Sequence, residues 1–201
     1  MTDVAKAWLA DTLLQFRKYK AMAEAALAQV DDADFFRTID PESNSVALVV
    51  KHLANNMRSR WTDFLTTDGE KPGRNRDTEF ERESTDTRQS LMGRWEEGWA
   101  LTFAAIEPLR EADLLHEVPI RGQPHTVMQA VHRQLTHYAY HVGQIVFLAK
   151  HFRSTKWQSL SIPRNRSAQF NAFLTAQPGG VADREKQFDA ATGFAQSSDK
   201  K

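Results

Sequence analysis

Apolar residues recur at three- and four-residue steps in four long segments of the chain, which is the period of an amphipathic α-helix. The segments span residues 3–30, about 44–65, 87–106 and 127–152. The apolar face of the first comprises Val4, Trp8, Leu9, Thr12, Phe16, Tyr19, Ala23 and Leu27. Four such faces can close on one another, so the pattern predicts an all-α fold built as a four-helix bundle.

Capping and breaking residues set the expected ends of these helices. Ser43, Asn44 and Ser45 all offer N-cap oxygens at the start of the second helix, Thr126 is expected to cap the fourth, and Pro108 ends the third. A short helix is expected over residues 167–174, and residues 118–120 are expected to form a short strand beside a turn. We assign residues 1–176 to one helical domain and residues 177–201 to a flexible C-terminal tail.

The connections between the helices differ greatly in length. Residues 66–87 are rich in turn formers and charges and predict a long surface loop. A loop of this length in a small domain is often functional, although we expect most of its residues to form an inert, solvated connection. Residues 31–43 are expected to be an irregular connector. In the irregular stretch 153–163, we expect Trp157, Leu160 and Ile162 to anchor the chain against the core.

Composition excludes several classes of function. The 26 basic and 26 acidic residues balance, which argues against a protein that grips nucleic acid or an anionic membrane through basic residues. Cysteine is absent, so disulfides, cysteine-ligated zinc, iron–sulfur clusters and a cysteine nucleophile are all excluded. No apolar run approaches a membrane span, and Asp3 and Asp11 interrupt any signal-peptide pattern, so we expect a cytoplasmic protein.

Two histidines in the fourth long helix form the most informative pattern. His137 and His141 lie four residues apart, so both imidazoles project from one helix face and can reach a common ion. The residue after His137 is Tyr138 rather than Glu, which excludes the metalloprotease pattern that carries its own general base. His52, in the middle of an apolar helix face, is the best candidate for a third ligand, and three imidazoles leave a coordination position open.

A structural role for the same residues stays open at this point. Seven histidines can place a pair four residues apart by chance, and His52 can be a hydrogen-bonded core residue. We expect the remaining histidines to face solvent or loops: His116, His125, His132 and His151.

The order of these histidines in a four-helix pattern resembles the DinB-like (YfiT-like) metalloprotein superfamily, and in particular one uncharacterised bacterial branch. The likeness covers about residues 5–175. It is carried by the segments LVVKHLANNMRSRWTDFLTTDGEKP (48–72), IRGQPHTVMQAVHRQLTHYAYHVGQIVFLAKH (120–151) and WQSLSIPRNRSAQFN (157–171).

This resemblance implies a bundle with a divalent ion held by His52, His137 and His141. Zinc and nickel are the leading candidates, with iron and manganese also open. Relatives of this kind form homodimers. Some are S-transferases that join a low-molecular-weight thiol to an electrophile, and others have been proposed as hydrolases.

Weaker candidates for the surroundings of the ion come from the same helices. Arg60, Asp63 and Tyr140 are the candidate catalytic residues: Arg60 could clamp a carboxylate, Asp63 could orient a ligand or act as a base, and Tyr140 could donate to an oxyanion. Ion pairing for Arg60 and Asp63, and packing for Tyr140, are the structural alternatives. Other candidates for the pocket are Asn56, Gln134, Gln144, Arg164 and Arg166, while Trp61, Trp95 and Trp99 are expected in the core.

Two classes of function follow from these observations. The first is a metal-dependent enzyme acting on a small molecule, either a thiol S-transferase or a hydrolase. The alternative is a non-catalytic metal-binding or small-molecule-binding module, such as a dimeric stress-response protein. Nucleic-acid binding is disfavoured because the arginines of residues 74–88 are matched by acidic neighbours.

Overall fold

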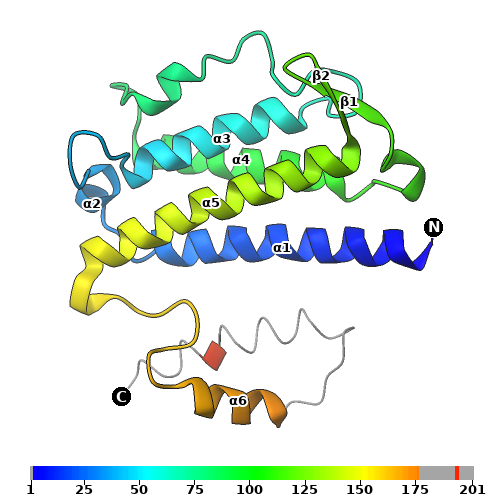
Figure 1. Ribbon diagram of the computed structural model, residues 1–201. Helices are drawn as coiled ribbons and strands as arrows, with labels where there is room; N and C mark the ends of the chain where they lie inside the picture. The colour runs from blue at the N-terminus through cyan, green and yellow to red at the C-terminus, as the bar shows by residue number, and fades with distance from the viewer. Residues whose placement is uncertain (1, 177–192, 195–201) are drawn as a thin grey trace.

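The computed structural model describes residues 2–176 and 193–194, and its regular structure is almost entirely helical (Figure 1). The α-helices are α1 (Asp3–Leu27), α2 (Asp32–Phe36), α3 (Val46–Trp61), α4 (Arg88–Ile106), α5 (Val127–Arg153) and α6 (Ser167–Thr175). Short 3₁₀ helices are η1 (Asp77–Phe80), η2 (Glu111–Asp113) and η3 (Ser154–Lys156), and the strands are β1 (Glu117–Ile120) and β2 (Gln123–Thr126). The predicted all-α fold is confirmed.

The four long helices form a bundle in which α3 packs chiefly on α4, and α1 packs on α5. Figure 1 shows that α3 and α4 run in the same direction, while α5 runs antiparallel to α3. At 1.5 Å per residue, α3 is about 24 Å long, so the chain must return that distance before α4 can begin. The topology therefore requires the long connection 62–87, which passes over the outside of α3 (Figure 1).

Side-chain caps begin the bundle helices where the sequence indicates. Ser45 accepts a hydrogen bond from the Leu48 amide at the start of α3, and Thr126 caps α5 through the Gln129 amide. Of the three candidates for the α3 cap, Ser45 is therefore the one used, and the expected cap at Thr126 is confirmed. α1 ends at Leu27 and α3 ends at Trp61, each a few residues before the expected end.

The connector 31–43 contains a helix that the apolar pattern did not predict. Asp31 caps the five-residue α2 by accepting from the Asp34 amide, and this helix buries Phe35 completely. A single buried aromatic in so short a segment gives no periodic signal, because the pattern needs at least two turns to show.

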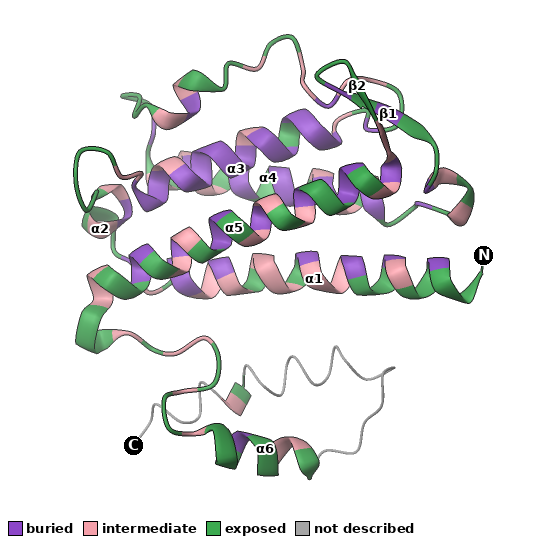
Figure 2. Cartoon of the chain, viewed as in Figure 1, coloured by how far each residue is buried: buried purple, intermediate pink, exposed green. Residues whose placement is uncertain are grey.

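Aromatic rings fill the centre of the bundle. Phe16 of α1 lies edge-on to the rings of Trp61, Trp99 and Tyr138, which come from the other three helices. Figure 2 shows the buried residues of α1 along the side that faces the bundle, and α3 buried over most of its surface. The expected core roles of Trp61, Trp95 and Trp99 are confirmed, whereas Val4 is wrong as a core position, since it is 78% exposed.

A hydrogen bond inside this aromatic centre gives a testable prediction for stability. Trp61 Nε1 donates to the Tyr138 hydroxyl at 2.9 Å, and both side chains are buried. Replacing Tyr138 with Phe leaves the indole N–H without its partner, which should lower the free energy of unfolding by about 1–3 kcal/mol. Urea denaturation measures the change, and Tyr140→Phe on the exposed side of α5 is the matched control. Equal stabilities of the two variants would contradict the prediction.

A two-stranded hairpin joins η2 to α5. β1 and β2 pair antiparallel, with Ile120 opposite Gln123, and both Arg121 and Gly122 adopt positive φ in the turn. The expected strand at 118–120 is confirmed, and its partner strand is new. Asp68 of the long connection accepts from the backbone amides of Arg121 and Gly122, so the connection and the hairpin are tied together.

The segment after α5 leaves the bundle. Trp157 and Leu160 pack against the core as expected, but Ile162 is 42% exposed and is not an anchor. α6 matches the short helix expected at 167–174 and lies beyond α1 in Figure 1. Most of the expected tail lies outside the described residues. No helix in the described part of the chain combines the length and apolar character that a bilayer crossing requires.

Candidate metal centre

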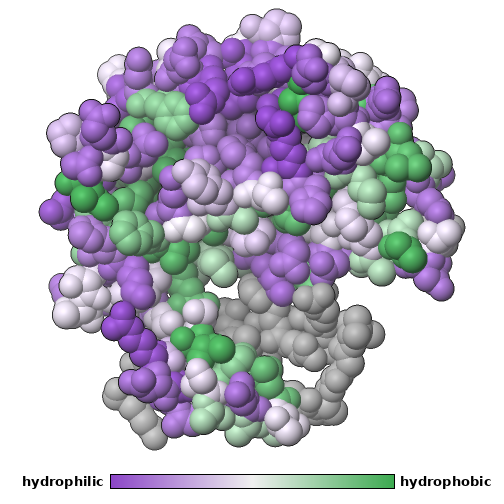
Figure 3. Space-filling view, viewed as in Figure 1, coloured by the Kyte–Doolittle hydropathy of each residue, from purple (hydrophilic) through white to green (hydrophobic). Residues whose placement is uncertain are grey.

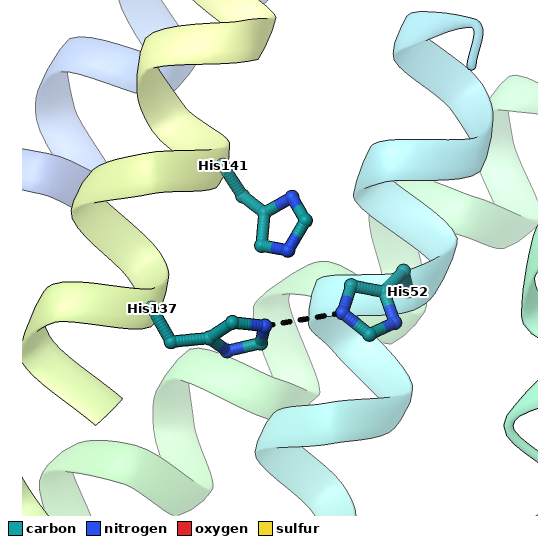
Figure 4. Close-up of side chains that lie close together, drawn as sticks. All are labelled: His52, His137 and His141. Carbon is teal, nitrogen blue, oxygen red and sulfur yellow. Dashed lines mark hydrogen bonds between the residues drawn. The ribbon is translucent and has the colours of Figure 1, made fainter. Parts of the chain in front are cut away.

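Three histidine side chains from two helices converge on one point between α3 and α5 (Figure 4). His52 projects from α3, and His137 and His141 project from successive turns of α5. One ring nitrogen from each lies within 4.8 Å of the others, and the Nε2 atoms of His52 and His137 are 3.2 Å apart. The structure thus brings the three predicted ligands together.

A carboxylate from the long connection holds His52. Glu79, in η1, accepts from His52 Nδ1 at 2.7 Å, and the Phe80 ring stacks on the imidazole at 4.8 Å. Arg74 in turn donates to both carboxylate oxygens of Glu79, at 2.8 and 2.9 Å. Burial alone would raise the pKa of Glu79, but the hydrogen bonds from His52 and Arg74 lower that pKa below its usual value.

The amide of Gln144 holds His141 in the same manner. Gln144 Oε1 lies 2.7 Å from His141 Nδ1. A carboxylate and an amide oxygen can only accept, so the Nδ1 atoms of His52 and His141 carry their protons and the Nε2 atoms carry lone pairs. Gln144 therefore orients the His141 ring, because such partners fix the tautomer of metal-binding imidazoles.

The donor set fits a divalent first-row ion. Imidazole nitrogens bind zinc at about 2.0–2.1 Å, so two nitrogens on one tetrahedral ion lie about 3.3–3.4 Å apart. The 3.2 Å between His52 Nε2 and His137 Nε2 is close to this separation. The described residues bring no fourth histidine or carboxylate into the group, so the arrangement matches an open three-histidine site rather than a closed structural one.

Burial keeps two of these histidines neutral. It lowers the pKa of His137 to about 3, with help from the neighbouring His141 and His52. It also lowers the pKa of His141 to about 4. Both imidazoles therefore remain unprotonated, and able to bind a cation, throughout the neutral range.

These shifts predict how acid affects the metal-free protein. The unfolded histidines bind protons near pH 6.5, whereas the folded ones resist protonation to about pH 3–4, so the unfolded state binds more protons in this range. Protonation of these two histidines therefore does not change the free energy of unfolding above pH 6.5, and this free energy should fall as the pH drops towards 4. Denaturant titrations across this range measure the free energy of unfolding at each pH. His137→Gln should reduce the dependence of this free energy on pH, and His132→Gln should leave the dependence unchanged. The same dependence in all three proteins would rule the effect out.

The triad opens on a pocket of about 620 Å³ between α3, α5 and the long connection. The three histidines lie along one part of its wall, and arginines line much of the rest. A small molecule can therefore reach the point where the three imidazoles meet.

Comparison with known proteins identifies the family. A model of the family described as "Protein of unknown function (DUF1572)" matches residues 3–166. The chain belongs to this family. No curated protein and no solved structure matches it. The family description assigns no activity, and the DinB-like resemblance stays a prediction.

The other predicted pocket residues of this DUF1572 protein divide into two groups. Asn56, Arg60, Gln134, Tyr140 and Gln144 all line the pocket. Tyr140 is 63% exposed, so it stands at the rim and is not packed in the core.

The remaining candidates do not reach the pocket. Asp63 lies beyond the end of α3 with φ of 48°, and it borders a separate surface depression. The helix ends two residues earlier, so Asp63 leaves the face that carries His52. Arg164 and Arg166 are also absent from the pocket wall, and the three tryptophans lie in the core.

Sequence reasoning missed the residues that the long connection supplies. Glu79 is buried and bonded to a predicted ligand, and Arg74 is bonded to Glu79. The connection was expected to be mostly inert, but Arg74, Arg76 and Phe80 line the pocket and Glu79 holds His52. Irregular chain has no period, so a charged loop gives no signal for which of its acids turns inward.

Proposed function

We propose that this protein is a metal-dependent enzyme that acts on a small molecule, with a divalent ion held by His52, His137 and His141. The observation that carries the proposal is the convergence of three ring nitrogens on a pocket, without a fourth histidine or carboxylate from the described residues. A structural metal site would be expected to be closed by a fourth protein ligand.

Zinc or nickel suits three imidazoles best, and iron or manganese is also compatible with the donor set. When bound, such an ion lowers the pKa of a coordinated thiol or water and so supplies a nucleophile at neutral pH. The absence of cysteine is no obstacle to thiol transfer, because the substrate brings the sulfur.

The residues around the triad have distinct proposed roles. Glu79 and Gln144 hold His52 and His141 in the tautomer that presents Nε2 to the pocket. We propose that Tyr140, at the rim beside His141, donates a hydrogen bond to an incoming oxyanion. Arg60 is placed to bind an anionic group of the substrate.

Thiol S-transfer is the reaction class that we propose first, with hydrolysis second. Both fit the DinB-like resemblance, which the three-histidine arrangement on α3 and α5 supports. Homodimerisation, a cytoplasmic location, a thiol substrate and the absence of nucleic-acid and membrane partners all stay predictions.

A conjugation assay tests the proposal. Protein loaded with zinc or nickel is mixed with a small thiol and an aromatic halide, and thioether formation is followed by absorbance. We expect metal-dependent turnover that chelation abolishes and that His141→Ala lacks. A parallel assay with activated esters tests hydrolysis. Absence of turnover in both assays, with metal bound, would favour the non-catalytic binding module.

A further inference from the structure

The pocket beside the triad carries a strong excess of positive charge. Its lining includes Arg60, Arg74, Arg76, Arg121 and Arg133, and no aspartate or glutamate. Figure 3 shows strongly hydrophilic side chains gathered over the part of this face where Figure 1 places α3, α5 and the long connection. A surface of this kind attracts anions.

Nearby carboxylates offset only part of this charge. Glu79 pairs with Arg74, and Glu70 lies 3.3–3.4 Å from Arg60, Arg74 and Arg121 together. Within the described residues, neither Arg76 nor Arg133 forms an ion pair. Two carboxylates therefore form ion pairs with three of these five guanidinium groups, and Asp68 adds a third negative charge near Arg60, so the pocket keeps a net positive charge.

The side chains of Arg60 and Arg74 are both almost fully buried, and of the two it is Arg60 that keeps unpaired donors in the described chain. Only 5% of the residue is exposed, and within the described residues its Nε and Nη1 atoms have no hydrogen-bond partner. Gly69 packs closely on the Arg60 side chain: a Cβ added to Gly69 would lie 2.8 Å from Arg60 Nη1. The Arg60 guanidinium is therefore held in a fixed position. A buried, oriented guanidinium with spare donors suits planar recognition of an oxyanion.

Two buried amides lie between Arg60 and the triad. Asn56 sits one helical turn from His52 and one turn from Arg60, and Gln134 faces it from α5. The Oδ1 atom of Asn56 and the Oε1 atom of Gln134 are both buried without a partner in the described chain. Buried polar groups are normally paired, so these oxygens are available to a polar ligand.

From these observations we infer that the pocket selects an elongated small organic anion, whose carboxylate or phosphate is held by Arg60 and Arg133 while its other end faces the triad. His52, Asn56 and Arg60 lie at successive turns of α3, so the two ends are separated by about 12 Å along the helix before side-chain reach is subtracted. Asn56 and Gln134 contact the middle of the ligand. The metal-binding end of this ligand rests on the proposed function, whereas the anion end does not.

Isothermal titration of the zinc-loaded protein tests this inference. The probes are 6-mercaptohexanoate, 6-mercaptohexyl phosphate and the neutral 6-mercaptohexanamide. We expect at least one anion to bind about tenfold or more tightly than the amide. Arg60→Gln should remove this preference and leave amide binding unchanged. Arg58→Gln, on the exposed side of the same helix, is the matched control and should behave as wild type.

A second variant and a metal-free titration separate this inference from the metal proposal. Arg133 is exposed on α5, so Arg133→Gln leaves the core intact and should also weaken the anions selectively. Equal binding of anions and amide by wild type, or equal loss of all three probes in Arg60→Gln and Arg133→Gln, would overturn the inference. If the protein takes up no zinc, inorganic phosphate is titrated into the metal-free protein. If phosphate binds saturably to wild type and not to Arg60→Gln, the anion subsite is supported without the metal site. If phosphate does not bind to wild type, the anion subsite is overturned.

Discussion

Replacing His137 with Ala should abolish tight metal binding while the bundle stays folded. The imidazole supplies one of only three converging ring nitrogens in the described chain, and the remaining pair would hold an ion weakly. His137 is only partly buried, so its truncation leaves no large cavity in the core and the fold should lose little stability. Metal content after dialysis against zinc, measured by elemental analysis, reports the loss.

His132→Ala is the matched control for this experiment. His132 lies on α5 five residues before His137, but it is exposed and does not line the pocket. It should retain the full metal content. If His137→Ala binds as much zinc as His132→Ala, the ligand assignment is wrong. Circular dichroism shows whether a variant that has lost zinc is still folded.

Replacing Glu79 with Gln should weaken metal affinity about 10–100-fold, the effect typical of losing a group that orients a ligand. Glutamine keeps the size of the side chain but removes the charge that fixes the His52 tautomer and neutralises Arg74. Competition titration with a zinc indicator measures the change. Some stability should also be lost, because Arg74 is left buried with a weaker partner.

Glu81→Gln provides the comparison for this charge change. Glu81 lies two residues away in the same connection, its side chain is exposed, and only its backbone oxygen bonds to Lys51. The affinity of Glu81→Gln for zinc should equal that of wild type. An unchanged affinity in Glu79→Gln as well would show that the carboxylate has no part in tuning the site.

The regular part of the fold could be predicted because helices repeat. The apolar steps in residues 127–152 and the cap at Thr126 place α5 almost to the residue, and the His137–His141 spacing then fixes both side chains on one face. His52 could be proposed because a histidine stands out on an apolar face of α3. In each case a local period carries the information.

The other half of the site comes from irregular chain and could not be predicted in this way. Glu79 reaches His52 only because α4 runs parallel to α3, which forces the connection across the outside of α3. Asp63 failed as a pocket residue for a related reason: the helix that was expected to carry it ends at Trp61. Both outcomes depend on topology and helix termination, which single-sequence periodicity defines least well.

X-ray absorption at the zinc edge of the loaded protein shows whether the three histidines bind the ion. We expect about one ion per chain, with three imidazole nitrogens at about 2.0–2.1 Å and one or two further light atoms from solvent. Addition of a small thiol should replace a light atom with sulfur at about 2.3 Å. Failure to retain zinc, or a spectrum without imidazole scattering, would show that no ion is held there and leave His52, His137 and His141 as structural histidines between α3 and α5.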